Sequence, residues 1–173
     1  MLLERRGPAD EARINRLFAV YSAELEALQP DLVAAGALQR RKAVQSLRIY
    51  GPLARKELER AVGDSDRQVR LDAVRGLVEV EGLTVGAAAE RRLESKDAAV
   101  ARPFLEAMVR EKGCAPFFLG VARDTQQPAA LRGDALAYLA DCDEGTRERA
   151  AKVVPFLTDP EALVRAGAVR SLG

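Results

Sequence analysis

A segment of fourteen residues occurs twice in this chain, and an internal repeat constrains the fold before any other feature does. The first copy is Asp64-Ser-Asp-Arg-Gln-Val-Arg-Leu-Asp-Ala-Val-Arg-Gly-Leu77, and the second runs from Asp159 to Leu172. Seven of the fourteen positions are identical in the two copies. Apolar residues recur at helical spacing within each copy, so both segments are predicted to be helices.

Weaker copies of the same pattern lie elsewhere in the chain. Residues 40–47 align with residues 70–77 at an offset of 30. Val100 follows Val69 by 31 residues, and Leu131 follows Val100 by another 31. Each of the first four copies is followed by a Gly-containing break and a second apolar segment, which predicts a pair of helices in those repeats. The fifth copy, which begins at Asp159, has no second helix. These second helices are expected at residues 52–62, 84–93, 116–122 and 146–157. Pro155 is expected to bend or shorten the last of them.

The first apolar segment matches none of the repeats. A helix capped by Asp10 is predicted to run to about Leu28 and to be closed by Pro30. Its apolar residues share one face at helical spacing: Ile14, Leu17, Phe18, Tyr21, Leu25 and Leu28. We expect this helix to cover the open end of the repeats. Caps of later helices are predicted at Asp64, Thr84 and Thr146.

The repeated pattern Asp-x4-Val-Arg-x2-Ala-x3-Leu, read from Asp64 to Leu77, resembles HEAT repeats, particularly the short HEAT-like class first described in phycobilisome lyases. The resemblance covers about residues 38–173. It implies an all-α fold, a right-handed α-solenoid of about four and a half HEAT-like helix pairs. In this interpretation residues 1–36 form the lead-in and capping helix, and residues 37–173 form the array. The units are expected near residues 38–63, 64–94, 95–124, 125–158 and 159–173.

Charge and composition exclude several classes of function. The chain has no histidine, which excludes His-based catalytic triads and His-containing metal sites. No P-loop and no GxGxxG after a strand is present. The net charge is +1 and tryptophan is absent, which argues against a nucleic-acid surface. No catalytic, cofactor-binding or metal-binding residue is predicted, and the chain is expected not to be an enzyme.

The two cysteines, Cys114 and Cys142, lie beside apolar runs. They are predicted to be buried free thiols in a reducing compartment. No stretch reaches the roughly 18 apolar residues of a membrane span, and the first residues contain no apolar signal segment. The chain is therefore expected to be soluble and cytoplasmic.

An arginine recurs at one position of the repeat, at Arg40, Arg70, Arg132 and Arg165. The HEAT-like resemblance implies that this arginine pairs with an acidic residue of a neighbouring turn, here Asp64 or Asp159. A guanidinium suits that role because it presents five donors in a fixed fork. The alternative is a cationic strip that binds phosphate or an acidic peptide.

The second helices of HEAT-like pairs usually line the concave face, and in this chain they carry more cations than anions. The predicted partner-binding residues are Arg55, Arg60, Arg91, Arg92, Arg147, Arg149 and Lys152. A basic groove favours an acidic protein segment. The alternative is an ordinary solvated face with weak pairs along each helix.

The favoured function is a non-catalytic scaffold that binds a protein partner, with no nucleic acid and no membrane span. One alternative is the cytoplasmic HEAT-repeat part of a membrane-tethered bacterial protein, and another is a lyase-like subunit that handles a tetrapyrrole. Four side chains at one phase of the repeat are predicted to be buried: Ala73, Leu77, Leu139 and Leu172. The sequence does not specify the oligomeric state.

Overall fold

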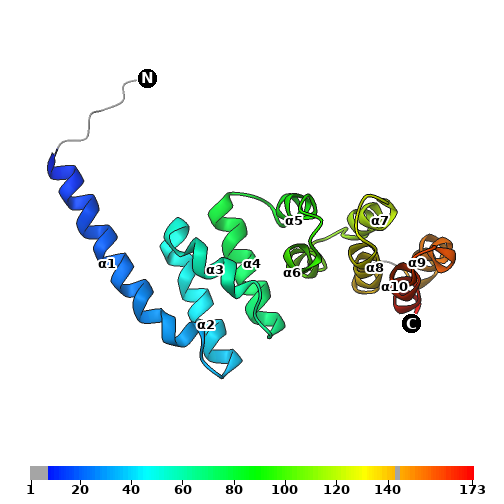
Figure 1. Cartoon of the computed structure of the whole chain (residues 1–173), viewed down its shortest axis with the longest axis horizontal. Coiled ribbons are helices and arrows are strands. Elements are labelled where there is room, and N and C mark those ends of the chain that lie inside the picture. Colours follow the sequence, from blue (N-terminus) through cyan, green and yellow to red (C-terminus); the bar gives the residue numbers. More distant parts are fainter. Residues whose placement is uncertain (1–7, 143–144) are drawn as a thin grey trace, which may run out of the picture. The chain divides into compact units, whose positions relative to one another are not determined.

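The computed structural model describes residues 8–142 and 145–173, with residues 8–10 described by their backbone. Every regular element in these ranges is a helix, as predicted (Figure 1). The chain divides into two compact units, Met1–Val80 and Glu81–Gly173.

The first unit packs four α-helices and a 3-10 helix around a small aliphatic core. Its elements are α1 (Pro8–Leu32), α2 (Ala37–Leu47), η1 (Arg48–Ala54), α3 (Arg55–Ala61) and α4 (Arg67–Glu81). Val44, Leu47, Leu58 and Leu77 are almost completely buried. Leu58 of α3 contacts the backbone of α4 at Gly76, where an added Cβ would lie 2.8 Å from a leucine methyl group. The absence of a side chain at Gly76 lets α3 and α4 pack closely at this point.

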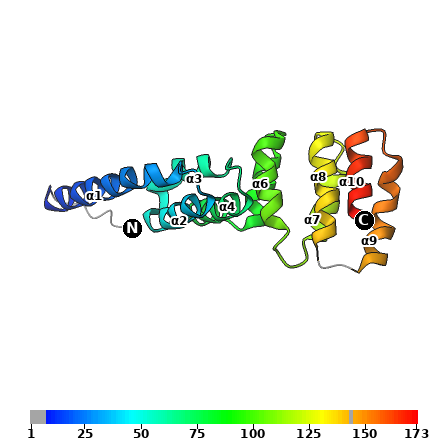
Figure 2. The ribbon, with the colours of Figure 1, turned by 90° about the horizontal axis from the view of Figure 1, so that it is seen from below.

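The second unit contains the remaining six α-helices of the described chain. They are α5 (Val85–Leu93), α6 (Ala98–Met108), α7 (Ala115–Arg123), α8 (Ala129–Tyr138), α9 (Thr146–Val153) and α10 (Ala162–Leu172), with 3-10 helices η2 (Leu139–Asp141) and η3 (Val154–Thr158). Helices α8 and α10 lie side by side (Figure 2). They approach closely because Gly167 of α10 faces the backbone of Gly133, and Gly133 of α8 faces the backbone of Leu163. Phe104 and Phe118 are the largest fully buried side chains.

The helix starts agree only in part with the predicted caps. The Thr84 hydroxyl accepts a hydrogen bond from the Ala87 N–H at 3.2 Å, which confirms that cap. Asp66, not Asp64, caps α4, since its Oδ1 accepts from Gln68 N–H at 2.8 Å. Thr146 is the first residue of α9 and not its cap, because Gly145 occupies the cap position.

Two prolines act differently from each other. Helix α1 continues through Pro30 to Leu32, so the prediction that Pro30 closes it is wrong, as is the predicted start at Asp10. A proline inside a helix removes one hydrogen bond and crowds the preceding turn. With only two residues after Pro30, this cost is confined to the end of the helix. Pro155 shortens its helix as predicted, since α9 ends at Val153 and the chain continues as η3.

The cysteine prediction is correct on burial and wrong on chemistry. Cys114 and Cys142 are 2% and 5% exposed, and they form a disulfide whose Cα atoms are 5.9 Å apart. The bond joins the start of α7 to the end of η2. The prediction of a reducing compartment rested on free thiols. The disulfide removes that argument, because disulfides persist in oxidising surroundings.

Three of the four side chains predicted to be buried are buried. Ala73 is 0% exposed, and Leu77 and Leu139 are each 1% exposed. Leu172 is only half-buried, and its neighbour Ser171 is buried in its place. Helix α10 turns Val164 and Ala168 toward α8. Ser171 continues that line at helical spacing, so it takes the inner position.

Candidate functional site: arginine contacts and an apolar groove

The four repeated arginines are used inside the fold. Arg40 forms a two-pronged pair with Asp64, with Nε–Oδ2 2.7 Å and Nη2–Oδ1 2.8 Å. Both side chains are largely buried. The Arg40 hydrogen bond outweighs burial and holds the pKa of the Asp64 carboxyl below its usual value. Arg40 also donates to the carbonyls of Ala34 and Ala35, so it ties one turn to the next.

Arg70 and Arg165 repeat the backbone contacts of Arg40. Arg70 donates to the carbonyls six and five residues before it, at 2.9 and 3.0 Å. Arg165 does the same at 2.8 Å in both cases. Arg132 is buried and instead donates to Asp159 at 2.5 Å and to the Ala122 carbonyl at 3.0 Å. The pairing expected with Asp64 and Asp159 is present at Arg40 and Arg132, and these contacts favour the structural interpretation over a ligand-binding strip.

The predicted partner-binding cations fall into two groups. Three are engaged within the second unit: Arg92 pairs with Glu81 at 2.7 Å, Arg149 donates to the Ser171 carbonyl at 3.0 Å, and Lys152 pairs with Glu148 at 3.3 Å. The Arg92 guanidinium also lies 4.8 Å over the Phe104 ring. Arg55, in the first unit, pairs with Glu59 one turn along α3.

Arg60, Arg91 and Arg147 are exposed. Arg55 and Arg60 belong to the first unit, and the other five predicted cations belong to the second.

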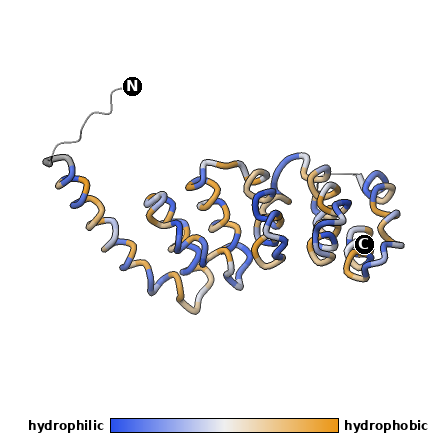
Figure 3. Tube along the Cα trace, turned by 45° about the horizontal axis from the view of Figure 1, so that its top comes forward, coloured by the Kyte–Doolittle hydropathy of each residue, from blue (hydrophilic) through white to orange (hydrophobic). Residues whose placement is uncertain are grey.

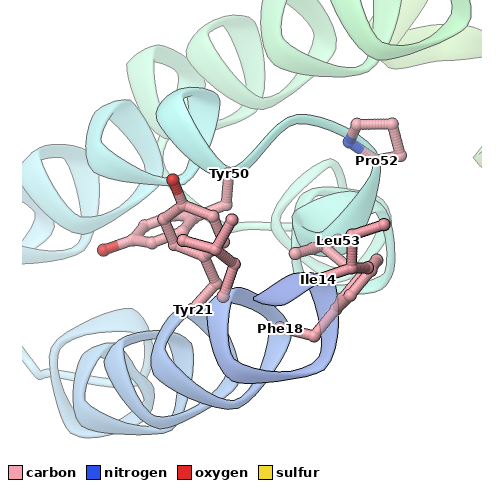
Figure 4. Close-up of a pocket in the computed structure, with 7 residues that line it drawn as sticks. Ile14, Phe18, Tyr21, Tyr50, Pro52 and Leu53 are labelled. Carbon is pink, nitrogen blue, oxygen red and sulfur yellow. The ribbon is translucent and has the colours of Figure 1, made fainter. Parts of the chain in front are cut away.

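A groove that the sequence did not predict lies between α1 and η1, within the first unit (Figure 4). Its volume is about 340 Å³, and all its lining side chains are apolar or aromatic: Ile14, Leu17, Phe18, Tyr21, Tyr50, Pro52 and Leu53. Leu17 and Phe18 are each 49% exposed and Tyr21 is 41% exposed. These side chains come from the predicted apolar face of the first helix, which the fold covers at Leu25 and leaves open toward the N-terminus.

The two walls of the groove differ in length. Helix α1 has 25 residues and η1 has 7. The opposite wall, η1, contains Gly51. Its φ of +52° is a backbone conformation that residues other than glycine rarely adopt. On one side of this break, Tyr50 lies beside Tyr21 of α1 (Figure 4).

Two tyrosines, Tyr21 and Tyr50, form one end of the groove (Figure 4). The rings of Tyr21 and Tyr50 meet edge to face with centroids 6.0 Å apart, a favourable arrangement for aromatic pairs. Burial raises the pKa of the Tyr50 hydroxyl, and the nearby Glu24 carboxylate adds to that rise. The two rings lie next to each other at one end of the groove (Figure 4).

Two cations adjoin the groove on α1. Arg13 and Arg16 line a shallow hollow together with Leu17 and Val20, and Leu17 also lines the groove. Both arginines are exposed, and no ion pair joins either of them to another side chain in the described ranges. Hydropathy alternates along this helix (Figure 3). One feature of the sequence could have indicated the α1–η1 groove. The first predicted helix is longer than the other predicted helices, and its apolar residues continue along its whole length.

Within residues 8–142 and 145–173, no group of three or more His, Cys, Asp or Glu side chains is placed to hold a metal ion. No helix in these ranges has the length and apolar character needed to cross a membrane. Comparison of the sequence with models of protein families and with curated proteins gives no match.

Proposed function

We propose that this chain is a non-catalytic scaffold that binds a partner protein through the α1–η1 groove. The observation that supports the proposal is the open apolar groove itself, in which Leu17, Phe18 and Tyr21 are each exposed over two-fifths or more of their surface. Adjacent exposed apolar side chains, rimmed by polar groups, mark interaction surfaces in soluble proteins. Tyrosines at one end are typical of interface hot spots.

The partner segment that fits this groove is amphipathic and acidic at its edge. Its apolar side chains would fill the space between α1 and η1, and its carboxylates would face Arg13 and Arg16. Charge complementarity of this kind mainly raises the association rate and selects the partner. The sequence also predicted an acidic partner, bound by cations of the second helices. The contacts that we propose here lie on α1.

The arrangement that we propose for the whole chain is a right-handed α-solenoid of HEAT-like pairs. The support is the recurrence of the same arginine-to-backbone contacts at Arg40, Arg70 and Arg165. Repeated units that reuse one local contact are characteristic of solenoids, where each repeat packs on its neighbours. Small-angle X-ray scattering of the chain should give the extended envelope of a solenoid, and a spherical envelope would contradict it.

A photo-crosslinking amino acid at Phe18 tests the binding proposal. Irradiation in native lysate, followed by mass spectrometry, should yield one dominant partner crosslinked through a segment that contains apolar and acidic residues. The purified partner should then bind the parent chain and lose at least about tenfold in affinity for Phe18→Ser or Leu17→Ser, a loss of about 1.4 kcal/mol.

The control variant is Ile49→Ser. Ile49 is 78% exposed and apolar, next to Tyr50 in sequence, but it does not line the groove. Its loss should leave partner affinity unchanged. Equal weakening by Ile49→Ser and Phe18→Ser would mean that general surface hydrophobicity, and not the groove, accounts for binding. Binding to anionic lipid vesicles in place of a protein would also overturn the proposal.

The alternatives remain separate predictions with their own tests. The open reading frame in the genome decides whether these helices belong to a membrane-tethered protein. Absorbance in the visible region of the purified native chain would support tetrapyrrole handling. Turnover that one point mutation abolishes would contradict the non-catalytic proposal.

A further inference from the structure

A second groove lies within the second unit, between α5 and α7 and beside the turn that precedes α8. Its volume is about 360 Å³. The lining consists of Glu90 and Leu93 from α5, Pro116, Phe117, Gly120 and Val121 from α7, and Asp124 and Gln127 from the turn. Leu93 and Val121 are buried and form an apolar floor. Phe117 is half-buried and its ring is held edge-on against the buried Phe118, with centroids 5.5 Å apart.

The charges of this groove are opposite to those beside the α1–η1 groove. Glu90 and Asp124 are its two charged lining residues, and both are exposed. No cation among the described side chains pairs with either carboxylate. Asp124 is fixed in place, because its Oδ1 accepts from Gln126 N–H at 2.9 Å and its Oδ2 from Gln127 Nε2 at 3.3 Å.

An apolar floor, an aromatic ring and two carboxylates together define the chemistry of the occupant.

We propose that the α5–α7 groove binds a basic polypeptide segment in which an arginine stands next to an aliphatic side chain. The aliphatic side chain packs on Leu93 and Val121, while the guanidinium pairs with Glu90 and Asp124. Arginine suits this site better than lysine because its planar group stacks on an aromatic ring such as Phe117 and presents several donors at once. This surface is distinct from the α1–η1 groove, and the two select segments of opposite charge.

Glycine at position 120 makes the proposal testable without damage to the core. Gly120 lines the groove, and a Cβ at this position would meet no heavy atom within 4 Å, so a side chain can start there without a clash at Cβ. Gly120→Phe should therefore block binding. Glu90→Lys reverses one rim charge, and Glu111→Lys makes the same change at an exposed residue that does not line the groove. Circular dichroism of each variant verifies the fold.

The probes are three dye-labelled synthetic peptides that alternate arginine with leucine, glutamate with leucine, and arginine with serine. Fluorescence anisotropy with the full chain should rank the arginine–leucine peptide first. Gly120→Phe and Glu90→Lys should each weaken its affinity about tenfold or more, while Glu111→Lys should change it less than about twofold. Amide NMR shifts in the parent chain should move at Gly120 and Val121, which requires no variant.

Each other outcome overturns the proposal. These outcomes are no binding of the arginine–leucine peptide at millimolar concentration, equal affinity for the glutamate–leucine peptide, or equal weakening by Glu111→Lys and Glu90→Lys. Amide shifts confined to α1 would place the peptide in the other groove and overturn it as well. Phe18→Ser should leave this peptide's affinity unchanged, so failure here is distinguishable from failure of the α1–η1 proposal.

Discussion

At the scale of single residues, two glycines on helices of the second unit have opposite surroundings. A Cβ on Gly167 of α10 would lie 2.1 Å from the Gly133 carbonyl oxygen, and that obstacle is backbone. Gly167→Ala should therefore destabilise the chain by about 1–3 kcal/mol. The clash with the backbone outweighs the stabilisation that alanine gains from its higher helix propensity. Gly120→Ala, which meets no atom, should be neutral or stabilising by up to about 1 kcal/mol. Urea unfolding measures both, and equal shifts would contradict the close approach of α8 and α10.

Another residue-scale prediction concerns pH. The Arg40 hydrogen bond lowers the pKa of the Asp64 carboxyl from its ordinary value of 3.8. A carboxylate with a lowered pKa in the folded state contributes stability that is present above its unfolded pKa and lost as pH falls through the folded one. Asp64→Asn should lower the urea midpoint at pH 7, and the difference from the parent should shrink as pH falls below 3.8. A difference that is the same at neutral and acidic pH would contradict an ionised Asp64–Arg40 pair.

At the scale of elements, the disulfide restrains the connection between α7 and η2. Its two cysteines are 28 residues apart. Closing a loop of that length stabilises a folded chain by about 3–4 kcal/mol in the chain-entropy description. The double variant Cys114→Ser/Cys142→Ser should lose this amount in urea unfolding, and dithiothreitol should reduce the stability of the parent alone. Two free thiols in the denatured, unreduced chain would show that the bond does not form.

The helices could be predicted from the sequence, and the surfaces between them could not. The repeat spacing of Ala73, Leu77 and Leu139 identified core positions, because a helical residue repeated at one phase meets the same neighbours each time. The disulfide was not predicted, because two isolated cysteines have no diagnostic spacing in the sequence. Their pairing depends on the distance between their Cα atoms in the fold. The α1–η1 groove was not predicted for a similar reason. The helical pattern alone places Phe18 on a face that is expected to be buried. Whether that face is covered depends on the length of the elements that pack against it.

At the scale of the whole molecule, the two compact units each hold a core of their own. Leu77 lies in the first unit and Leu136 in the second, and both are almost completely buried. Each leucine-to-alanine change should cost about 2–5 kcal/mol from lost burial and the cavity left behind. In chains built from repeats, stability is close to a sum of local terms, so the loss should stay near its source. Hydrogen exchange should therefore show Leu77→Ala loosening α2, α3 and α4 more than α8 and α10, and Leu136→Ala doing the reverse. The variants serve as each other's control. If either change lowered protection equally in both units, the chain would unfold as one cooperative body, and the additive description proposed for it would be wrong.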